Sequence, residues 1–256
     1  MSRLDEYGDK YTCIRMERRD GILQVTFHTD GGPLRWGLGP HGELPDAFAD
    51  IARDRDNRVI ILTGTGEEFS GPAATPGRSA ISQDITAATF DHVHRDGRKL
   101  LMNLLDIEVP VIAAVNGPAW RHSEIPLLSD IVLASETAAF QDSAHFPNGL
   151  VPGDGVHVVY PMLLGMNRAR YFLLTGQTLD AGQAKALGLV AEVLPQAQVL
   201  ARAWALAEDL TKKPTLLLRY TRLMFTEYLR RRMQELLGYG LALEGLALME
   251  RPEGKE

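Results

Sequence analysis

The sequence has few of the groups that build disulfides and metal centres. Cys13 is the only cysteine among 256 residues, which excludes an internal disulfide and a site with several thiolate ligands. The seven histidines form no His-Glu-x-x-His pair or other metal-ligand spacing, so we expect no metal. The Gly-x-x-x-x-Gly-Lys phosphate loop and the Gly-x-Ser-x-Gly nucleophile elbow are also absent from the sequence.

Positive charge and long apolar runs are scarce as well. The formal net charge is −6, which argues against a nucleic-acid or anionic lipid partner. The longest apolar runs, such as 109–115, are far shorter than the ~20 residues of a membrane-spanning helix. The first residues lack the apolar core of a secretory signal. With an apolar fraction of 45%, the chain is expected to be a globular cytoplasmic protein.

Strand and helix patterns alternate along the chain. The Asp20-Gly21 pair between two apolar runs is typical of a hairpin. Buried strands are predicted at 58–64, 109–115 and 130–134, and helices at 44–51, 90–105, 156–164, 168–175 and 180–187. This alternation predicts an α/β fold with parallel strands. From residue 199 the pattern is helical apart from a break at Pro214, and this arm is expected to cover its own active site or a neighbouring subunit.

Two polar loops stand out, and the first of them follows a predicted strand, where open α/β sheets place ligands. The first contains His122 and Glu124, and the second contains His145 and Asp154 in a segment rich in proline and glycine. A carboxylate on one imidazole nitrogen fixes the tautomer and leaves the other nitrogen as a base for water. Taken alone, the residues favour the simpler alternative, in which His145 is an ordinary loop residue and Asp154 a turn former or helix N-cap.

The order of several segments resembles the crotonase (enoyl-CoA hydratase/isomerase) superfamily. The matching stretches include Val59-Ile-Ile-Leu-Thr-Gly64, Pro110-Val-Ile-Ala-Ala-Val-Asn-Gly-Pro-Ala119, Ser129-Asp-Ile-Val-Leu-Ala134 and Ala186-Leu-Gly-Leu-Val-Ala-Glu-Val193. The resemblance implies a spiral of stacked ββα units over residues 1–195 and a helical trimerisation region over residues 196–256. It also implies a homotrimer or a dimer of trimers.

Two segments depart from the coenzyme A thioester enzymes of this superfamily. Those enzymes usually carry Phe-x-Ala-Gly-x-Asp after the first core strand, whereas here the stretch reads Phe69-Ser-Gly-Pro-Ala-Ala74. The Gly-Gly-Gly run that supplies the second oxyanion donor is replaced by Arg121-His122-Ser123, whose side chains obstruct the approach of a thioester carbonyl to the backbone. His145 and Glu124 stand where hydratases carry their two glutamates.

The same departures occur in the β-diketone hydrolase branch of the superfamily, of which 6-oxocamphor hydrolase is the characterised type. The sequence resembles this branch in His122-x-Glu-Ile-Pro, Phe140-Gln-Asp-x-x-His145-Phe-Pro and Val151-Pro-Gly-Asp-Gly155, and it matches least in the loop 69–83. The branch's functional residues find identities at Trp36, His41, His122, His145, Asp154 and Glu244.

This resemblance implies cofactor-independent hydrolysis of a carbon–carbon bond in a cyclic or bicyclic 1,3-diketone by a retro-Claisen reaction, which gives a keto acid. His145, oriented by Asp154, would take the proton from the attacking water. His122 and the indole N–H of Trp36 would stabilise the enolate in place of backbone amides, and protonation of one enolate face would make the product chiral. Glu244 would orient His122 or the substrate, and His41 would contact the substrate.

Simpler roles and other functions are the alternatives. Glu244 is otherwise a solvated helix residue, Trp36 a core aromatic and His41 part of a helix cap. An enoyl-CoA hydratase or isomerase on the same fold is the second functional hypothesis, and acyl-CoA turnover would favour it. A non-catalytic crotonase-like scaffold is the third, and a specific protein partner without activity would favour that one.

Overall fold

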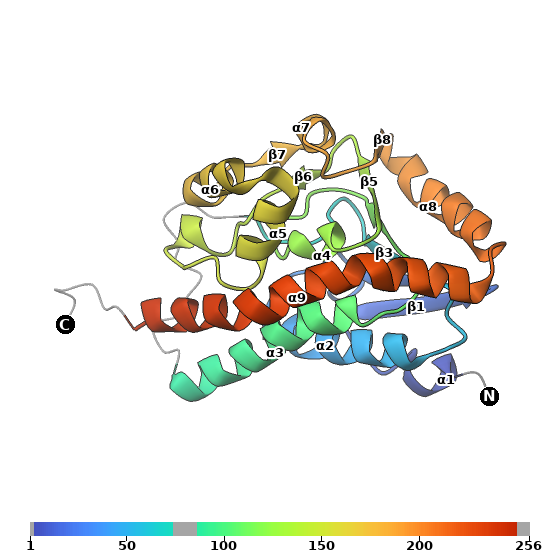
Figure 1. The fold of residues 1–256 in the computed structure, drawn as a ribbon, viewed down its shortest axis with the longest axis horizontal. Coiled ribbons are helices and arrows are strands. Elements are labelled where there is room, and N and C mark those ends of the chain that lie inside the picture. The colour runs from blue at the N-terminus through green and yellow to red at the C-terminus, as the bar shows by residue number, and fades with distance from the viewer. Residues whose placement is uncertain (1–2, 74–85, 250–256) are drawn as a thin grey trace.

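A six-stranded sheet in the order β1-β2-β3-β4-β5-β8 lies at the centre of the structure, a computed structural model that describes residues 3–73 and 86–249 (Figure 1). Its strands are β1 (Ile14–Arg19), β2 (Ile22–Phe27), β3 (Val59–Gly64), β4 (Val111–Val115), β5 (Ile131–Ser135) and β8 (Glu192–Leu194). A smaller antiparallel sheet pairs β6 (Ala139–Phe140) with β7 (Leu179–Asp180).

The helices cover both faces of the central sheet. They are α1 (Leu4–Tyr7), α2 (Leu38–Arg53), α3 (Ala87–Leu105), α4 (Glu124–Leu127), the 3-10 helix η1 (Phe146–Asn148), α5 (Val156–Leu164), α6 (Met166–Thr175), α7 (Ala181–Ala186), α8 (Gln196–Thr211) and α9 (Thr215–Ala247). No helix in the described ranges is both long enough and apolar enough to cross a membrane. The final residues of the predicted helical region, 250–256, lie outside the described residues.

The predicted hairpin is confirmed at the first sheet edge. Strands β1 and β2 pair in antiparallel register from Arg19 opposite Ile22 to Ile14 opposite Phe27. The two loop residues, Asp20 and Gly21, have φ values of 51° and 79°. Positive φ at both central residues is what a two-residue turn needs in order to match the twist of the strands, and Asp-Gly tolerates it.

The remaining strand pairs of the central sheet are parallel, as the alternation of strand and helix predicts. Alternate residues of β3 face opposite layers: Ile61 belongs to the smaller core cluster with α8, and Ile60 and Leu62 to the larger core of the other face. Burial on both faces explains why these strands read as continuous apolar runs. Parallel pairing also brings the carboxyl ends of β3, β4 and β5 to one edge of the sheet.

The 33-residue helix α9 runs across the molecule and contacts α3 and α5 (Figure 1). The C-terminal arm therefore packs on its own chain, which is the first of the two arrangements expected from the sequence. Arg222 anchors it: this side chain is 2% exposed, donates to the carbonyls of Leu104 and Ile107 near the end of α3, and pairs with Asp130.

We expect Arg222→Ala to lower the free energy of unfolding by ~3 kcal/mol, because it leaves Asp130 and two carbonyl groups without their donor. Urea denaturation measures this change. The matched control is Arg231→Ala, which removes an exposed pair with Glu227 worth only ~0.3–0.5 kcal/mol. Equal effects of the two substitutions would contradict the anchoring role of Arg222.

Candidate active site

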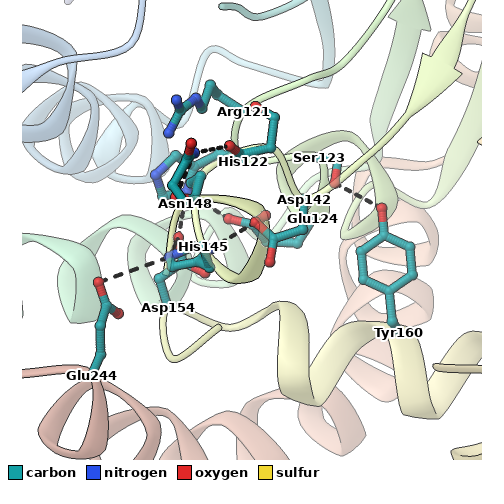
Figure 2. A network of polar contacts seen from close by, with 12 residues as sticks. Arg121, His122, Ser123, Glu124, Asp142, His145, Asn148, Asp154, Tyr160 and Glu244 are labelled. Atoms are coloured by element: carbon teal, nitrogen blue, oxygen red, sulfur yellow. Dashed lines mark hydrogen bonds and ion pairs between the residues drawn. The ribbon is translucent and has the colours of Figure 1, made fainter. Parts of the chain in front are cut away.

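Segments far apart in the sequence bring a cluster of imidazole and carboxyl groups together (Figure 2). His122 precedes α4, beyond the carboxyl end of β4, and Glu124 begins α4. His145 precedes η1, and Asp154 precedes α5 by two residues. Glu244 reaches the same cluster from α9 (Figure 2). All five side chains are buried, with exposures between 0% and 7%.

Backbone and amide hydrogen bonds shape the loop that carries His145. The amide group of Asn148 donates to the carbonyls of Ser143 and Ala144 at 2.6 and 3.1 Å, and the Asn148 backbone N–H donates to the His145 carbonyl at 2.8 Å. The Ser143 N–H donates to the Trp120 carbonyl at 3.0 Å, which joins this loop to the one that carries His122. The two loops found in the sequence therefore form one unit.

Two glycines allow the loop before α5 to touch α9. A Cβ atom on Gly153 would lie 2.3 Å from the Gly240 carbonyl oxygen, and one on Gly240 would lie 2.6 Å from the Gly153 carbonyl oxygen. Only residues without side chains permit this approach of two backbones. It brings Asp154 close to Glu244, which lies one helical turn after Gly240.

The imidazole of His145 lies between three carboxyl groups. Its Nδ1 is 2.6 Å from Asp142 Oδ1, whereas its Nε2 is 3.3 Å from Asp154 Oδ2 and 3.8 Å from Glu244 Oε1. The structure thus brings His145 and Asp154 together, as expected from the sequence. It corrects the orienting group, because the close partner at Nδ1 is Asp142, and Asp154 faces the nitrogen that would act as the base.

The second imidazole, His122, shares Asp154 with the first. His122 Nδ1 lies 2.6 Å from Glu124 Oε1 and 3.4 Å from Asp154 Oδ2. The backbone of His122 has a φ of 49°, in the left-handed region that non-glycine residues seldom adopt. Such a conformation costs on the order of 1–3 kcal/mol and is found most often where a side chain must be aimed.

Aromatic rings cover His122. Its ring centroid lies 3.8 Å from that of Trp36 and 5.4 Å from that of His41. Trp36 Nε1 and His41 Nδ1 are buried and have no hydrogen-bond partner in the described part of the chain. Trp36 also packs against the large core, so the simpler alternative, in which Trp36 is a core aromatic, describes part of its role. His41 lies inside α2, whose N-cap is Gly37, so its assignment to a helix cap is wrong.

The position of Glu244 disagrees with two of the three roles that the sequence left open. It is 7% exposed, so it is not a solvated helix residue. Its nearest imidazole is His145 rather than His122, at 3.8 Å from Nε2, and its Oε2 has no partner within the described residues. Any orienting effect of Glu244 therefore acts on the substrate, the water or His145.

Sequence reasoning missed Asp142 and the role of Tyr160. Asp142 stands three residues before His145 in Phe140-Gln-Asp-x-x-His145, and this spacing is the signal that could have identified it. The hydroxyl groups of Tyr160 and Ser123 are 2.7 Å apart. Because Ser123 stands between His122 and Glu124, this hydrogen bond fixes the position of the segment that carries both. No local pattern links Ser123 to a tyrosine 37 positions later.

The two imidazoles have opposite pKa shifts. Burial, together with repulsion from His145, outweighs the attraction of Asp154 and lowers the pKa of His122 to about 4, so its ring is neutral at neutral pH. Burial also lowers the pKa of His41, to about 3. Burial acts in the same direction on His145, but the carboxylates of Asp154, Asp142 and Glu244 and the hydrogen bond to Asp142 outweigh it and raise the pKa of His145 well above 6.5.

Burial raises the pKa values of the carboxyl groups. The pKa of Glu124 and that of Glu244 are each raised to about 8, chiefly because water is excluded from both groups. Burial also raises the pKa of Asp154, against the opposing effect of His145. A cluster that holds neutral acids beside a strongly basic imidazole can accept and return protons near neutral pH.

We expect the turnover of this site to rise with pH through the raised pKa of His145, because a general base must be unprotonated. The rising limb of kcat/KM should therefore lie above pH 6.5, and Asp142→Asn should move it to lower pH by removing one of the carboxylates that stabilise the imidazolium. A pH profile measured with a non-enolisable form of the 1,3-diketone substrate that the resemblance implies tests this. A limb that is unchanged in Asp142→Asn would contradict it.

A group of potential metal ligands lies within the cluster. His122, Glu124 and Asp154 each offer one potential ligand atom, and these three atoms lie within 4.8 Å of one another. The 2.6 Å separation of His122 Nδ1 and Glu124 Oε1 is a hydrogen-bond distance, and a cation between these atoms would have to break that bond. The donor set therefore fits a proton-sharing network better than a metal centre.

Comparisons with known proteins agree on one family. The enoyl-CoA hydratase/isomerase family profile matches residues 20–244. The chain is 34% identical over 208 residues to a probable enoyl-CoA hydratase, EchA12, of Mycobacterium tuberculosis, covering 78% of this chain and 72% of that protein. An enoyl-CoA hydratase/isomerase structure from Mycobacterium paratuberculosis has 25% identity and a TM-score of 0.83 over 94% of this chain and 95% of the other.

A β-diketone hydrolase structure is more similar. ABDH from the cyanobacterium Anabaena sp. PCC 7120, bound to (S)-3-oxocyclohexyl acetic acid, is 50% identical to this chain, with a TM-score of 0.90. The alignment covers 95% of this chain and 96% of the Anabaena chain. The spiral α/β fold with its helical C-terminal region, expected from the resemblance, is confirmed by these neighbours.

Proposed function

This chain belongs to the enoyl-CoA hydratase/isomerase family, and we propose that it uses the family fold to hydrolyse a carbon–carbon bond of a cyclic or bicyclic 1,3-diketone. The reaction is a retro-Claisen cleavage in which water is the nucleophile and the product is a keto acid. The acid bound to the similar Anabaena β-diketone hydrolase carries a ketone and a carboxylic acid, which is the product class expected of this reaction.

The backbone near Pro72 argues against thioester chemistry. Pro72 has no N–H group, and the neighbouring N–H groups of Ser70 and Gly71 donate to the carbonyls of Pro118 and Leu34 at 3.3 and 2.9 Å. The Arg121 side chain covers the Pro72 carbonyl, with Nε 3.2 Å from its oxygen. A coenzyme A enzyme of this family needs free backbone donors for the thioester oxygen, and these groups do not offer them.

The surroundings of His145 supply what water activation needs. Asp142 lies at Nδ1, so Nε2 is the nitrogen left to take a proton from water. Asp154 Oδ1 and Glu244 Oε2 are buried carboxylate oxygens without partners among the described residues, and both belong to the side chains that face Nε2. Buried acceptors of this kind attract a bound water. This arrangement around Nε2 is the observation on which the proposal depends.

The proposed reaction balances without a cofactor. His145 Nε2 takes one proton from water while the resulting hydroxide adds to one carbonyl carbon. The tetrahedral oxyanion then re-forms a C=O bond, and the bond from this carbon to the central carbon breaks. The electron pair of the broken bond passes to the central carbon and forms the enolate of the second carbonyl. The imidazolium returns its proton, through a protein group or directly, to that carbon. One water is consumed, and a ketone and a carboxylic acid are formed.

His122 and Trp36 are the donors proposed for the enolate oxygen. The two rings are in contact, with centroids 3.8 Å apart and planes tilted by 36°, and the indole Nε1 is buried without a partner in the described chain. The neutral His122 ring, with a pKa lowered to about 4, donates a hydrogen bond without adding a full positive charge. Side-chain donors thus replace the backbone amides that a glycine run would supply.

The test is an ultraviolet assay with purified protein and an enolised cyclic 1,3-diketone, because cleavage removes the absorbance of the conjugated enol. We expect loss of absorbance with one equivalent of keto acid formed. In ¹⁸O-labelled water, one labelled oxygen should enter the new carboxyl group. A bicyclic diketone, followed by chromatography, extends the assay to substrates without a stable enol.

Crotonyl-CoA is the contrasting substrate. The enoyl-CoA hydratase relatives and the position of Glu124, where a hydratase carries one of its glutamates, make acyl-CoA turnover the second candidate. We expect crotonyl-CoA to be neither hydrated nor bound in a calorimetric titration. Hydration of crotonyl-CoA, together with inert diketones, would overturn the proposed function in favour of the second one.

We also propose that the chain forms a homotrimer through α9. The face of α9 that points away from the core carries large apolar side chains that are between 60% and 70% exposed: Tyr220, Met224, Tyr228 and Tyr239. Large exposed apolar patches favour subunit contacts. Light scattering after gel filtration should give the mass of three chains or six, and a monomer at micromolar concentration would contradict the proposal.

A further inference from the structure

Glu124 is the carboxyl group of the site that the proposed reaction does not use. It is 0% exposed, its Oε1 lies 2.6 Å from His122 Nδ1, and its Oε2 has no hydrogen-bond partner in the described ranges. It begins α4, directly after the strained backbone of His122 and the residue whose hydroxyl contacts Tyr160 (Figure 2). Its place relative to His122 is therefore fixed by covalent geometry and by packing.

The proposed enolate donor imposes a requirement on the His122 tautomer. A neutral imidazole carries one N–H, so His122 donates from Nε2 only if Nδ1 is bare. A bare Nδ1 is an acceptor and needs a donor on its partner. At 2.6 Å that partner is Glu124 Oε1, which can donate only as a protonated carboxylic acid.

We propose that Glu124 is a neutral carboxylic acid that donates its O–H to Nδ1 of His122 and thereby holds the Nε2–H of this ring toward the substrate oxygen. The inference rests on the proposed diketone hydrolysis for its catalytic meaning. Glu124 is in this view a positioning residue, because it acts on the substrate only through His122.

Charge around the carboxyl group supports the neutral form. Asp154 Oδ2 lies 3.4 Å from the same Nδ1, so the opposite tautomer would place two buried carboxylates around one neutral ring. Uncompensated buried charges are costly, and protonation of one carboxyl removes that cost. Glu124 is the better candidate, because its side chain is fully buried, whereas Asp154 also lies 3.3 Å from His145 Nε2, which favours the anion of Asp154.

Several titratable groups surround Glu124. Asp142 and Asp154 disfavour its anion by repulsion, His145 favours it by attraction, and the hydroxyl of Tyr160 lies on the neighbouring helix α5. Burial dominates this balance and raises the pKa of Glu124 to about 8. The acid is therefore protonated at neutral pH and becomes ionised in the mildly alkaline range.

The first experiment reads the tautomer without substrate. In ¹⁵N-histidine-labelled protein at pH 7, we expect His122 to have a protonated Nε2 and a pyridine-type Nδ1, with its signals identified by their loss in His122→Ala. Glu124→Gln should preserve this tautomer, since the amide N–H₂ can donate to Nδ1, and Glu124→Ala should lose it. A protonated Nδ1 in the wild-type protein would overturn the inference, whatever the substrate of the enzyme is.

The second experiment is a pH profile with a diketone that cannot enolise. Wild-type kcat/KM should fall in the alkaline range as Glu124 loses its proton, and this alkaline limb should be absent from Glu124→Gln, whose amide does not ionise. Glu124→Gln should retain kcat within about tenfold, whereas Glu124→Ala should lose about 10²-fold, the usual cost of a displaced oxyanion donor.

The matched control is Glu136→Gln, the same substitution at an exposed glutamate outside the site, which should leave the profile unchanged. An alkaline limb that persists in Glu124→Gln, or equal losses in the glutamine and alanine variants, would overturn the role of Glu124. Inactivity of the wild-type protein toward every diketone would instead remove the proposed function, while the tautomer measurement still decides the state of Glu124.

Discussion

Replacing His145 with alanine is expected to lower kcat for a cyclic 1,3-diketone by about 10²–10⁴-fold, the usual contribution of general-base catalysis. The imidazole is 4% exposed and lies between Asp142 at Nδ1 and Asp154 at Nε2. No other described imidazole has this arrangement, because Nδ1 of His122 faces Glu124 and its pKa, lowered to about 4, makes it a weak base. Steady-state kinetics with the ultraviolet assay measure the loss.

Asp154→Asn is expected to lower kcat by a comparable amount. Its carboxylate faces His145 Nε2 at 3.3 Å and stabilises the imidazolium that forms when water is deprotonated. The amide has nearly the same shape but carries no charge, so the substitution tests electrostatics more than packing. Thermal unfolding of each variant separates a loss of rate from a loss of structure.

The control for these variants is His94→Ala on α3, outside the cluster, which should keep wild-type kcat. Near wild-type turnover by His145→Ala would end its assignment as the base. If Asp154→Asn were inactive while His145→Ala remained active, the Asp154 carboxylate itself would have to be the base. The pH profile would then not depend on His145.

His122→Ala is expected to cost about 2.7–4 kcal/mol of transition-state stabilisation, or about 10²–10³-fold in kcat, as the loss of one oxyanion donor does elsewhere. The enolate charge exists only after the carbon–carbon bond begins to break, so the donor acts on kcat more than on KM. The neighbouring Trp36, whose ring centroid lies 3.8 Å from that of His122, is the proposed second donor.

Trp36→Phe is the matched variant, because it keeps an aromatic ring beside His122 and removes the indole N–H. We expect a smaller loss than in His122→Ala, again in kcat. An increase in KM alone for His122→Ala would show that this side chain binds the substrate uniformly and would contradict the enolate role. Because both residues act on one oxygen, their losses are not expected to add.

Much of the fold could be predicted from local patterns. The helix predicted at 156–164 is α5 with the same bounds, and the Asp20-Gly21 turn and the buried strand before Gly64 lie where their patterns place them. Helix boundaries were less well predicted. Helix α2 begins at Leu38 rather than near residue 44, because the stretch 38–43 contains two glycines and a proline and carries no apolar period. The poorly matched loop 69–83 extends beyond the described residues after position 73.

The residues of the site were found by resemblance, whereas their partners were not. Trp36, His41, His122, His145, Asp154 and Glu244 do lie together. The three-residue spacing of Asp142 and His145 was a signal for their contact, but it did not show that Asp142 rather than Asp154 lies at Nδ1. The approach of Glu244 to His145 instead of His122 had no signature in the sequence. Hydrogen-bond partners depend on differences of an ångström in side-chain position, which motif spacing does not specify.

By itself, then, the amino-acid order determined the alternation of strands and helices and the chemistry of the side chains available, since periodicity and turn propensity are local properties. The assignment of each carboxyl group to an imidazole nitrogen was decided only in three dimensions. For Glu244, it depends on the contact of the Gly153 and Gly240 backbones, which places a helix from the end of the chain against a loop almost ninety positions earlier. The tertiary structure also buries the carboxyl groups of Asp154 and Glu244, and this burial raises their pKa values.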